Sequence, residues 1–231
     1  MTVCTETSQA SWLMHSQVSW QQLVSFGPAG FPAYARLRFL PDPTTPGQRE
    51  SEAIVRPGAP TECEQVHTVL AYLARHTGTP DQCYFCLWDG WWTPVSATPQ
   101  PTAQPWSRDE AAISDAPGTT QHGLQPDRMQ STPPAHGAAI VGIPNRNYYL
   151  LQGGWSDFRD WGALQREDAS PSSVPVPSFI WPADHAWCIA RDVDPHYAGI
   201  GATPAAIQEL VDVPRLDVVR ADPREEPLHY V

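Results

Sequence analysis

The sequence has no lysine. All fourteen basic residues are arginine, and 25 acidic residues give a formal net charge of −11 over 231 residues. Nucleic-acid-binding proteins generally present a basic patch or stripe to the phosphate backbone. The densest arginine pair, Arg36 and Arg38, alternates along one expected strand and forms no such patch. The composition therefore speaks against a nucleic-acid partner; the acidic charge suits a basic protein partner, or it serves solubility alone.

Long apolar runs are also absent. No stretch approaches the ~20 apolar residues that a membrane-spanning helix needs. Residues 1–17 contain neither the basic segment nor the apolar segment of a signal peptide. We therefore expect a cytoplasmic protein with no membrane partner, in which the five cysteines stay reduced.

Helix patterns are few because proline is abundant. The 26 prolines are about twice the usual share of ~5%. The clearest helix is predicted over residues 61–78, where Thr61 and Glu64 have the spacing of a capping box and apolar residues follow a helical period. A second helix is predicted over residues 203–213, and the glycine-bearing residues 197–201 before it are interpreted as a turn that enters this helix. Residues 94–137 are rich in proline and polar residues, which predicts a long flexible insertion.

Strand patterns are more numerous than helix patterns. Residues 33–40 alternate between polar and apolar side chains, as in a strand with one buried face. Other short runs predict strands at 83–88, 138–144, 147–153, 178–181, 186–193 and 215–221, and short helices at 19–26 and 155–164. Strands and helices do not alternate regularly. We therefore expect a single α+β domain over residues 1–231, with an antiparallel or mixed sheet and a few packed helices.

The stretch "CYFCLWDGWW" contains two cysteines, Cys83 and Cys86, at the spacing of a metal-binding or redox motif. A structural zinc site needs four ligands, and no second cysteine pair exists. A thioredoxin-like pair opens a helix, whereas these residues read as an aromatic strand. On a strand the two thiols point to opposite faces. The pattern favours two core cysteines, with a metal site and a redox pair as alternatives.

The stretch "DHAWC" brings Asp184, His185 and Cys188 close together in sequence, as an oriented base and a thiol nucleophile would need. Members of a catalytic triad usually come from distant positions, however. Cys188 should lie with Ala186 and Ala190 on one strand face, which is typical of packing. We favour packing for the thiol and a turn role for His185.

The best chemical candidate is formed by Asp192, Asp194 and His196. On an extended chain these three side chains share one face, where two carboxylates and an imidazole could hold a divalent metal or act as acid and base. The alternative interpretation is a solvated face of a strand that leaves the sheet at Pro195. The trio remains a hypothesis for both a catalytic and a metal site.

Tryptophan is unusually frequent, with ten residues in the chain. Aromatic side chains bury large areas in cores and also serve as anchors in interfaces. Many of these tryptophans lie near predicted strand ends and helix faces. They are more numerous than the packing of one modest core requires. We expect a binding site among Trp88, Trp91, Trp92, Trp155 and Trp181.

Several stretches resemble a known group of proteins, notably "FGPAGFPAYARLRFLPDP", "NYYLLQG" and "FIWPADHAWCIARDVD". The chain resembles a family of tryptophan-rich cytosolic proteins from actinobacteria, for which no activity is established. The resemblance implies a bacterial cytosolic protein and explains the arginine-only basic set through GC-rich coding. In general type, the chain is also similar to small acidic immunity proteins of bacterial toxin systems.

Three functional hypotheses follow. The first is a non-enzymatic binding protein, possibly immunity-like in character, which acts on a protein partner or by self-association as a homo-oligomer and needs no cofactor. The second is a metal-assisted hydrolase that uses Asp192, Asp194 and His196. The third is a carrier of a small ligand in a tryptophan-lined pocket.

Overall fold

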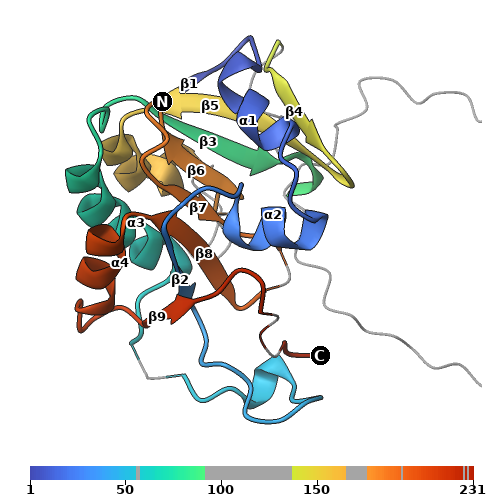
Figure 1. The fold of residues 1–231 in the computed structure, drawn as a ribbon, viewed down its shortest axis with the longest axis vertical. Coiled ribbons are helices and arrows are strands. Elements are labelled where there is room, and N and C mark those ends of the chain that lie inside the picture. Colours follow the sequence, from blue (N-terminus) through green and yellow to red (C-terminus); the bar gives the residue numbers. More distant parts are fainter. Residues whose placement is uncertain (56–57, 92–136, 165–175, 194, 226, 228) are drawn as a thin grey trace, which may run out of the picture.

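The computed structural model describes residues 1–55, 58–91, 137–164, 176–193, 195–225, 227 and 229–231 (Figure 1). Their strands form one sheet in the order β1-β5-β3-β6-β7-β8-β2-β9, with β4 also paired to β5. The strands are β1 (Thr2–Val3), β2 (Ala33–Arg38), β3 (Cys83–Trp88), β4 (Ile140–Ile143), β5 (Arg146–Gly153), β6 (Phe179–Pro182), β7 (Cys188–Ala190), β8 (Tyr197–Ala202) and β9 (Val218–Ala221). Neighbouring strands run antiparallel. The predicted α+β class is confirmed.

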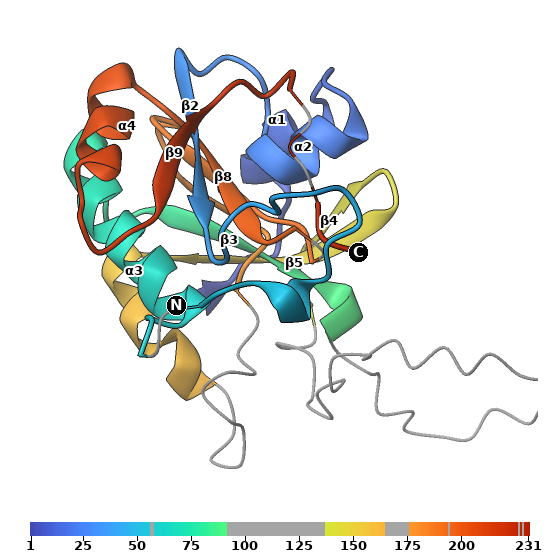
Figure 2. The ribbon, with the colours of Figure 1, turned by 90° about the horizontal axis from the view of Figure 1, so that it is seen from below.

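Helices cover both faces of the sheet (Figures 1 and 2). One face carries α3 (Glu62–Leu73) and α4 (Pro204–Val211), and the other carries α1 (Ser11–Met14) and α2 (Trp20–Phe26). Short 3₁₀ helices complete the set: η1 (Ser8–Ala10), η2 (Glu50–Glu52), η3 (Ala74–His76), η4 (Asp89–Trp91) and η5 (Trp155–Leu164). Most of the expected insertion, residues 94–136, lies outside the described residues.

The two helices with the strongest sequence signals form as predicted. In the α3 capping box the Thr61 hydroxyl accepts from the Glu64 backbone N–H at 3.3 Å, and the Glu64 carboxylate accepts from the Thr61 N–H at 2.7 Å. At α4 the Thr203 hydroxyl accepts from the Ala206 N–H, and Pro204 occupies the first turn. Each bond satisfies a backbone donor that would otherwise lack a partner.

The short helix predicted over residues 155–164 is present and is a 3₁₀ helix. Trp155, Phe158 and Trp161 recur every three residues, which matches the three residues per turn of a 3₁₀ helix. Phe158 and Trp161 are buried, and both rings lie within 6.3 Å of Phe85 on β3. The apolar stripe therefore faces the sheet.

The sheet separates two hydrophobic cores. One lies beneath α3, α4 and η5, and the other beneath α1 and α2. Cys83 belongs to the first core and Cys86 to the second, and both are fully buried. The prediction that the two thiols of β3 point to opposite faces is confirmed, because side chains alternate along a strand.

Strand β8 corrects the sequence interpretation of residues 197–201 as a glycine-bearing turn. It pairs with β7 and β2, and all its residues are buried. A Cβ atom on Gly199 would lie 2.0 Å from the Ser25 carbonyl oxygen, and one on Gly201 would lie 2.3 Å from the Phe31 ring. The glycines are therefore needed because α2 and the segment after it pack directly on the strand.

Candidate functional site

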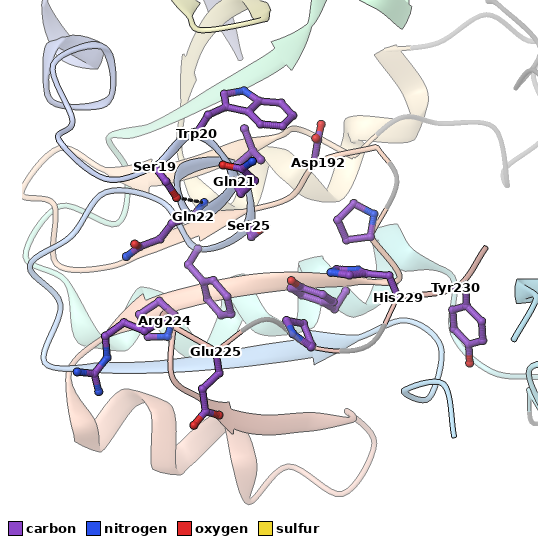
Figure 3. Close-up of a pocket in the computed structure, with 16 residues that line it drawn as sticks. Ser19, Trp20, Gln21, Gln22, Ser25, Asp192, Arg224, Glu225, His229 and Tyr230 are labelled. Atoms are coloured by element: carbon purple, nitrogen blue, oxygen red, sulfur yellow. Dashed lines mark hydrogen bonds between the residues drawn. The ribbon is translucent and has the colours of Figure 1, made fainter. Parts of the chain in front are cut away.

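A pocket of about 670 Å³ lies between α2 and residues 223–231, here called the C-terminal segment (Figure 3). Trp20 and Asp192 lie together at one end of it, and Arg224 and Glu225 lie at the other (Figure 3). The lining residues are Ser19, Trp20, Gln21, Gln22, Val24, Ser25, Phe26, Asp192, Pro195, Tyr197, Pro223, Arg224, Glu225, Pro227, His229 and Tyr230. The wall thus combines aromatic rings, amide and hydroxyl groups and a few charges.

Helix α2 provides one wall of the pocket. The Ser19 hydroxyl accepts from the Gln22 backbone N–H at 3.2 Å and caps the first turn. The helix ends at Gly27, whose φ of +80° suits glycine and whose N–H bonds to the Leu23 carbonyl. Buried apolar residues hold the helix against β7 and β8. This packing fixes the position of Trp20 and the glutamines.

The C-terminal segment provides the opposite wall. The Tyr230 hydroxyl donates to the Pro41 carbonyl at 2.7 Å, and the Val231 N–H donates to the Gln48 carbonyl at 3.0 Å. The His229 ring stacks near the Tyr197 ring, with centroids 6.3 Å apart. These contacts tie the end of the chain to β8 and to the loop after β2.

Asp192, which lines the pocket, takes part in a partly buried ion pair. The carboxylate is 7% exposed and lies 3.3 Å from Nε and 3.4 Å from Nη2 of Arg146. The Arg146 guanidinium lies over the rings of Trp20 and Trp88, 5.5 Å and 5.2 Å from their centroids. A single arginine at the start of β5 thus connects Asp192 to two tryptophans.

His196 belongs to a different network. Its Nε2 atom lies 3.0 Å from Oδ1 of Asp42, which also accepts from Arg36 at 2.5 Å and 3.0 Å and from Arg38 at 2.8 Å. Burial tends to raise the pKa of Asp42, but the hydrogen bonds from Arg36, His196 and Arg38 outweigh it and hold the pKa well below 3.8. The imidazole therefore faces an ionised carboxylate.

The hypothetical trio thus divides between two networks. Asp192 pairs with Arg146 and His196 pairs with Asp42, while Asp194 lies outside the described residues. In the described part of the chain, no group of three or more His, Cys, Asp or Glu side chains is arranged to hold a metal ion.

The residues of "DHAWC" have structural partners. The Asp184 carboxylate accepts from the Thr77 hydroxyl at 2.7 Å, the Gly78 N–H at 2.7 Å and the Ala186 N–H at 3.1 Å, and so ties two loops together. His185 stands in a turn with φ of +55° and stacks on Trp12 at 4.2 Å. These contacts agree with the turn role expected for His185.

The cysteines sit in surroundings that disfavour a thiolate. Cys188 packs with Ala190 in the second core, and burial raises the pKa of its thiol far above 9.0. Burial also raises the pKa of Cys83 to about 12 and that of Cys63 to about 11. Ala186 packs against the first core, not beside Cys188 as expected, because β7 begins only at Cys188.

The described tryptophans of the predicted binding site lie in different parts of the fold. Trp181 is fully buried against Tyr84 and Trp12, so it contributes to the core. Trp155 packs against the first core and Trp88 against the second, and both are partly buried. The Trp91 side chain and all of Trp92 lie outside what is described.

Sequence reasoning missed most of the pocket. Trp20, Tyr197, His229 and Tyr230 were not among the candidates, and only Asp192 was. The sequence offered one signal for the pocket, the adjacent aromatic residues His229 and Tyr230 at the end of a polar tail. It gave no indication of a partner, because α2 and the tail are far apart in the sequence.

No family model, curated protein or solved structure matches the chain. In the described residues, every helix is too short or too polar to cross a membrane. The role of the pocket can therefore be inferred only from its own residues and their arrangement.

Proposed function

We propose that the protein is a non-enzymatic binding protein that takes its ligand in the pocket between α2 and the C-terminal segment. The observation that carries the proposal is the pocket itself. Its volume of about 670 Å³ falls within the ~300–1,000 Å³ typical of ligand sites. Aromatic rings supply contact area there, and amide, hydroxyl and carboxylate groups supply directional bonds.

The side chains that could have been reactive already bond to other groups of the protein, which favours binding over catalysis. Asp192, His196 and Asp184 each bond to an arginine, a carboxylate or backbone N–H groups. The thiols of Cys86 and Cys188 are buried and their pKa values are raised. A general base or nucleophile needs a pKa suited to proton transfer and access to the substrate.

The pocket is a better candidate than an apolar docking face. In the described residues, large exposed apolar side chains are few and fall on three separate segments: Ile54, Val55, Ile140 and Val231. Isolated residues of this kind are normal on a monomer surface. A protein partner, as expected from the acidic composition, would then enter the pocket with a side chain or a short segment.

The test is a fragment screen by protein-observed NMR on the full chain. We expect hits whose shift changes map to α2 and residues 223–230. A Gln22→Trp variant would fill the pocket from α2, because Gln22 lines it and its side chain takes part in no bond of the described residues. Binding should be lost in this variant.

The matched control is Gln82→Trp, the same replacement at an exposed glutamine that does not line the pocket and whose side chain also takes part in no bond of the described residues. Binding should survive there. Hits that map elsewhere, or that bind Gln22→Trp as well as the unmodified chain, would contradict the proposal.

A further inference from the structure

The charges on the pocket wall are mainly negative. Two carboxylates, Asp192 and Glu225, and one guanidinium, Arg224, line the pocket. The Arg224 guanidinium is already engaged, with Nε 2.9 Å and Nη2 2.5 Å from the Asp222 carboxylate. Asp192 is likewise paired, with Arg146, so the charge of the wall that lacks an ion-pair partner among the described residues is that of Glu225, which is negative.

Asp192 has hydrogen-bonding capacity left. A carboxylate offers about four lone-pair positions, and Arg146 occupies two of them at 3.3 Å and 3.4 Å, beyond the usual length of a charge-assisted bond. No third donor reaches its oxygens from the described residues. A nearly buried carboxylate gains from further N–H donors.

The rings of the pocket already contact planar cations within the protein. The Arg146 guanidinium lies over Trp20, and the Arg36 guanidinium lies over Tyr197 at 5.1 Å. Both rings line the pocket, together with those of His229 and Tyr230. Such electron-rich faces attract cations, and a flat cation can stack on them as well.

We infer that the group recognised by this pocket is a planar organic cation of the guanidinium or amidinium class. The inference rests on the proposed function of the pocket. Donors of the cation bond to the oxygens of Asp192 and its flat face lies among the rings, while Glu225 adds negative charge at the other end of the pocket (Figure 3). The pocket is much larger than one such group, so the cation belongs to a larger molecule, either a free small molecule or an arginine side chain of a protein.

The test compares three molecules of nearly the same shape: benzamidinium, benzamide and benzoate, with charges of +1, 0 and −1. Their binding to the full chain is measured by NMR titration at low salt. We expect benzamidinium to bind about tenfold more tightly than benzamide, the scale of a partly desolvated charged contact, and benzoate to bind weakest.

Two variants locate the charge effect. Glu225→Gln removes an exposed carboxylate with little risk to the fold, and Asp192→Asn keeps an acceptor for Arg146. Both should reduce the preference for benzamidinium over benzamide. Asp212→Asn, directly after α4, is the control and should leave the preference unchanged.

The outcomes separate the inference from the proposed function. If benzamide or benzoate binds in the pocket as well as benzamidinium, the pocket is a binding site but the inference is overturned. If fragments bind nowhere near α2, both are overturned. Where the preference is found, agmatine and an arginine-containing tetrapeptide distinguish the sources, because tighter binding of the peptide indicates a protein ligand and tighter binding of agmatine a small molecule.

Discussion

At the scale of single residues, three aspartates are held in place by hydrogen-bond and ion-pair networks. Asp42, Asp184 and Asp192 each accept two or more hydrogen bonds, and each joins segments that are distant in sequence or on different elements. Leaving a buried charge without its partner costs more free energy than the bond itself provides. The side chains that looked most reactive in the sequence are therefore largely explained by structure.

The Arg146–Asp192 pair gives the sharpest prediction at this scale. Arg146→Met should lower the free energy of unfolding by about 3 kcal/mol, because Asp192 is left buried without its partner. The double variant Arg146→Met, Asp192→Leu should recover most of that loss, since two apolar residues replace both charges. Urea denaturation measures both effects, and a double variant that is less stable than Arg146→Met would contradict the account.

The cysteines give a second prediction. Cys83, Cys86 and Cys188 are fully buried, and burial raises the pKa values of their thiols. We expect these three to react with DTNB only as the protein unfolds, while the partly buried Cys4 and Cys63 react earlier. Mass spectrometry of the labelled protein identifies the sites. Fast labelling of Cys86 in the native protein would show that its strand is not enclosed as described.

At the scale of elements, local signals decided what could be predicted. Helix α3, helix α4 and strand β3 follow from capping residues, apolar spacing and an aromatic run, all of which act within a few residues. Strand β8 was not predicted because its glycines are typical of a turn. In the structure, glycine is needed there because α2 packs too closely on the strand to leave room for a side chain. The pocket could not be predicted either, because it depends on packing between segments that are far apart in the sequence.

The approach of α2 to β8 can be tested with one methyl group. Gly199→Ala should destabilise the protein by about 2–3 kcal/mol, because the new Cβ would meet the Ser25 carbonyl at 2.0 Å. The matched control is Gly142→Ala on the exposed face of β4, where the nearest atom outside its own neighbours lies 3.5 Å away. Thermal unfolding of both variants measures the difference, and equal stabilities would argue against close packing of α2 on β8.

At the scale of the whole molecule, carboxyl groups whose pKa values are lowered in the folded protein make stability depend on pH. The pKa of Asp42 is lowered in the folded protein, so its contribution to stability is complete above about pH 4, near the pKa of an unfolded aspartate. That contribution disappears as the pH falls through the folded-state value. The pKa of Asp184 is also lowered, because the hydrogen bonds it accepts outweigh its burial, and Asp184 adds a dependence in the same direction.

The acid sensitivity should therefore depend on Asp42. We expect the midpoint of urea unfolding to fall as the pH decreases from 5 to 2, and to fall less steeply in Asp42→Asn. Glu6→Gln, which removes an exposed carboxylate that makes no hydrogen bond in the described residues, serves as the control. An Asp42→Asn variant with the full acid dependence would show that the network around His196 does not control it.

The most direct test of the binding account uses the tryptophans as reporters. The protein is labelled with 5-fluorotryptophan, the ten ¹⁹F signals are assigned by single Trp→Phe variants, and benzamidinium or the best fragment is added. The signal of Trp20 should move most, while those of the buried Trp181 and Trp187 should stay in place. Movement of the Trp91 and Trp92 signals with Trp20 unchanged would place the binding site elsewhere and contradict binding in the pocket beside α2.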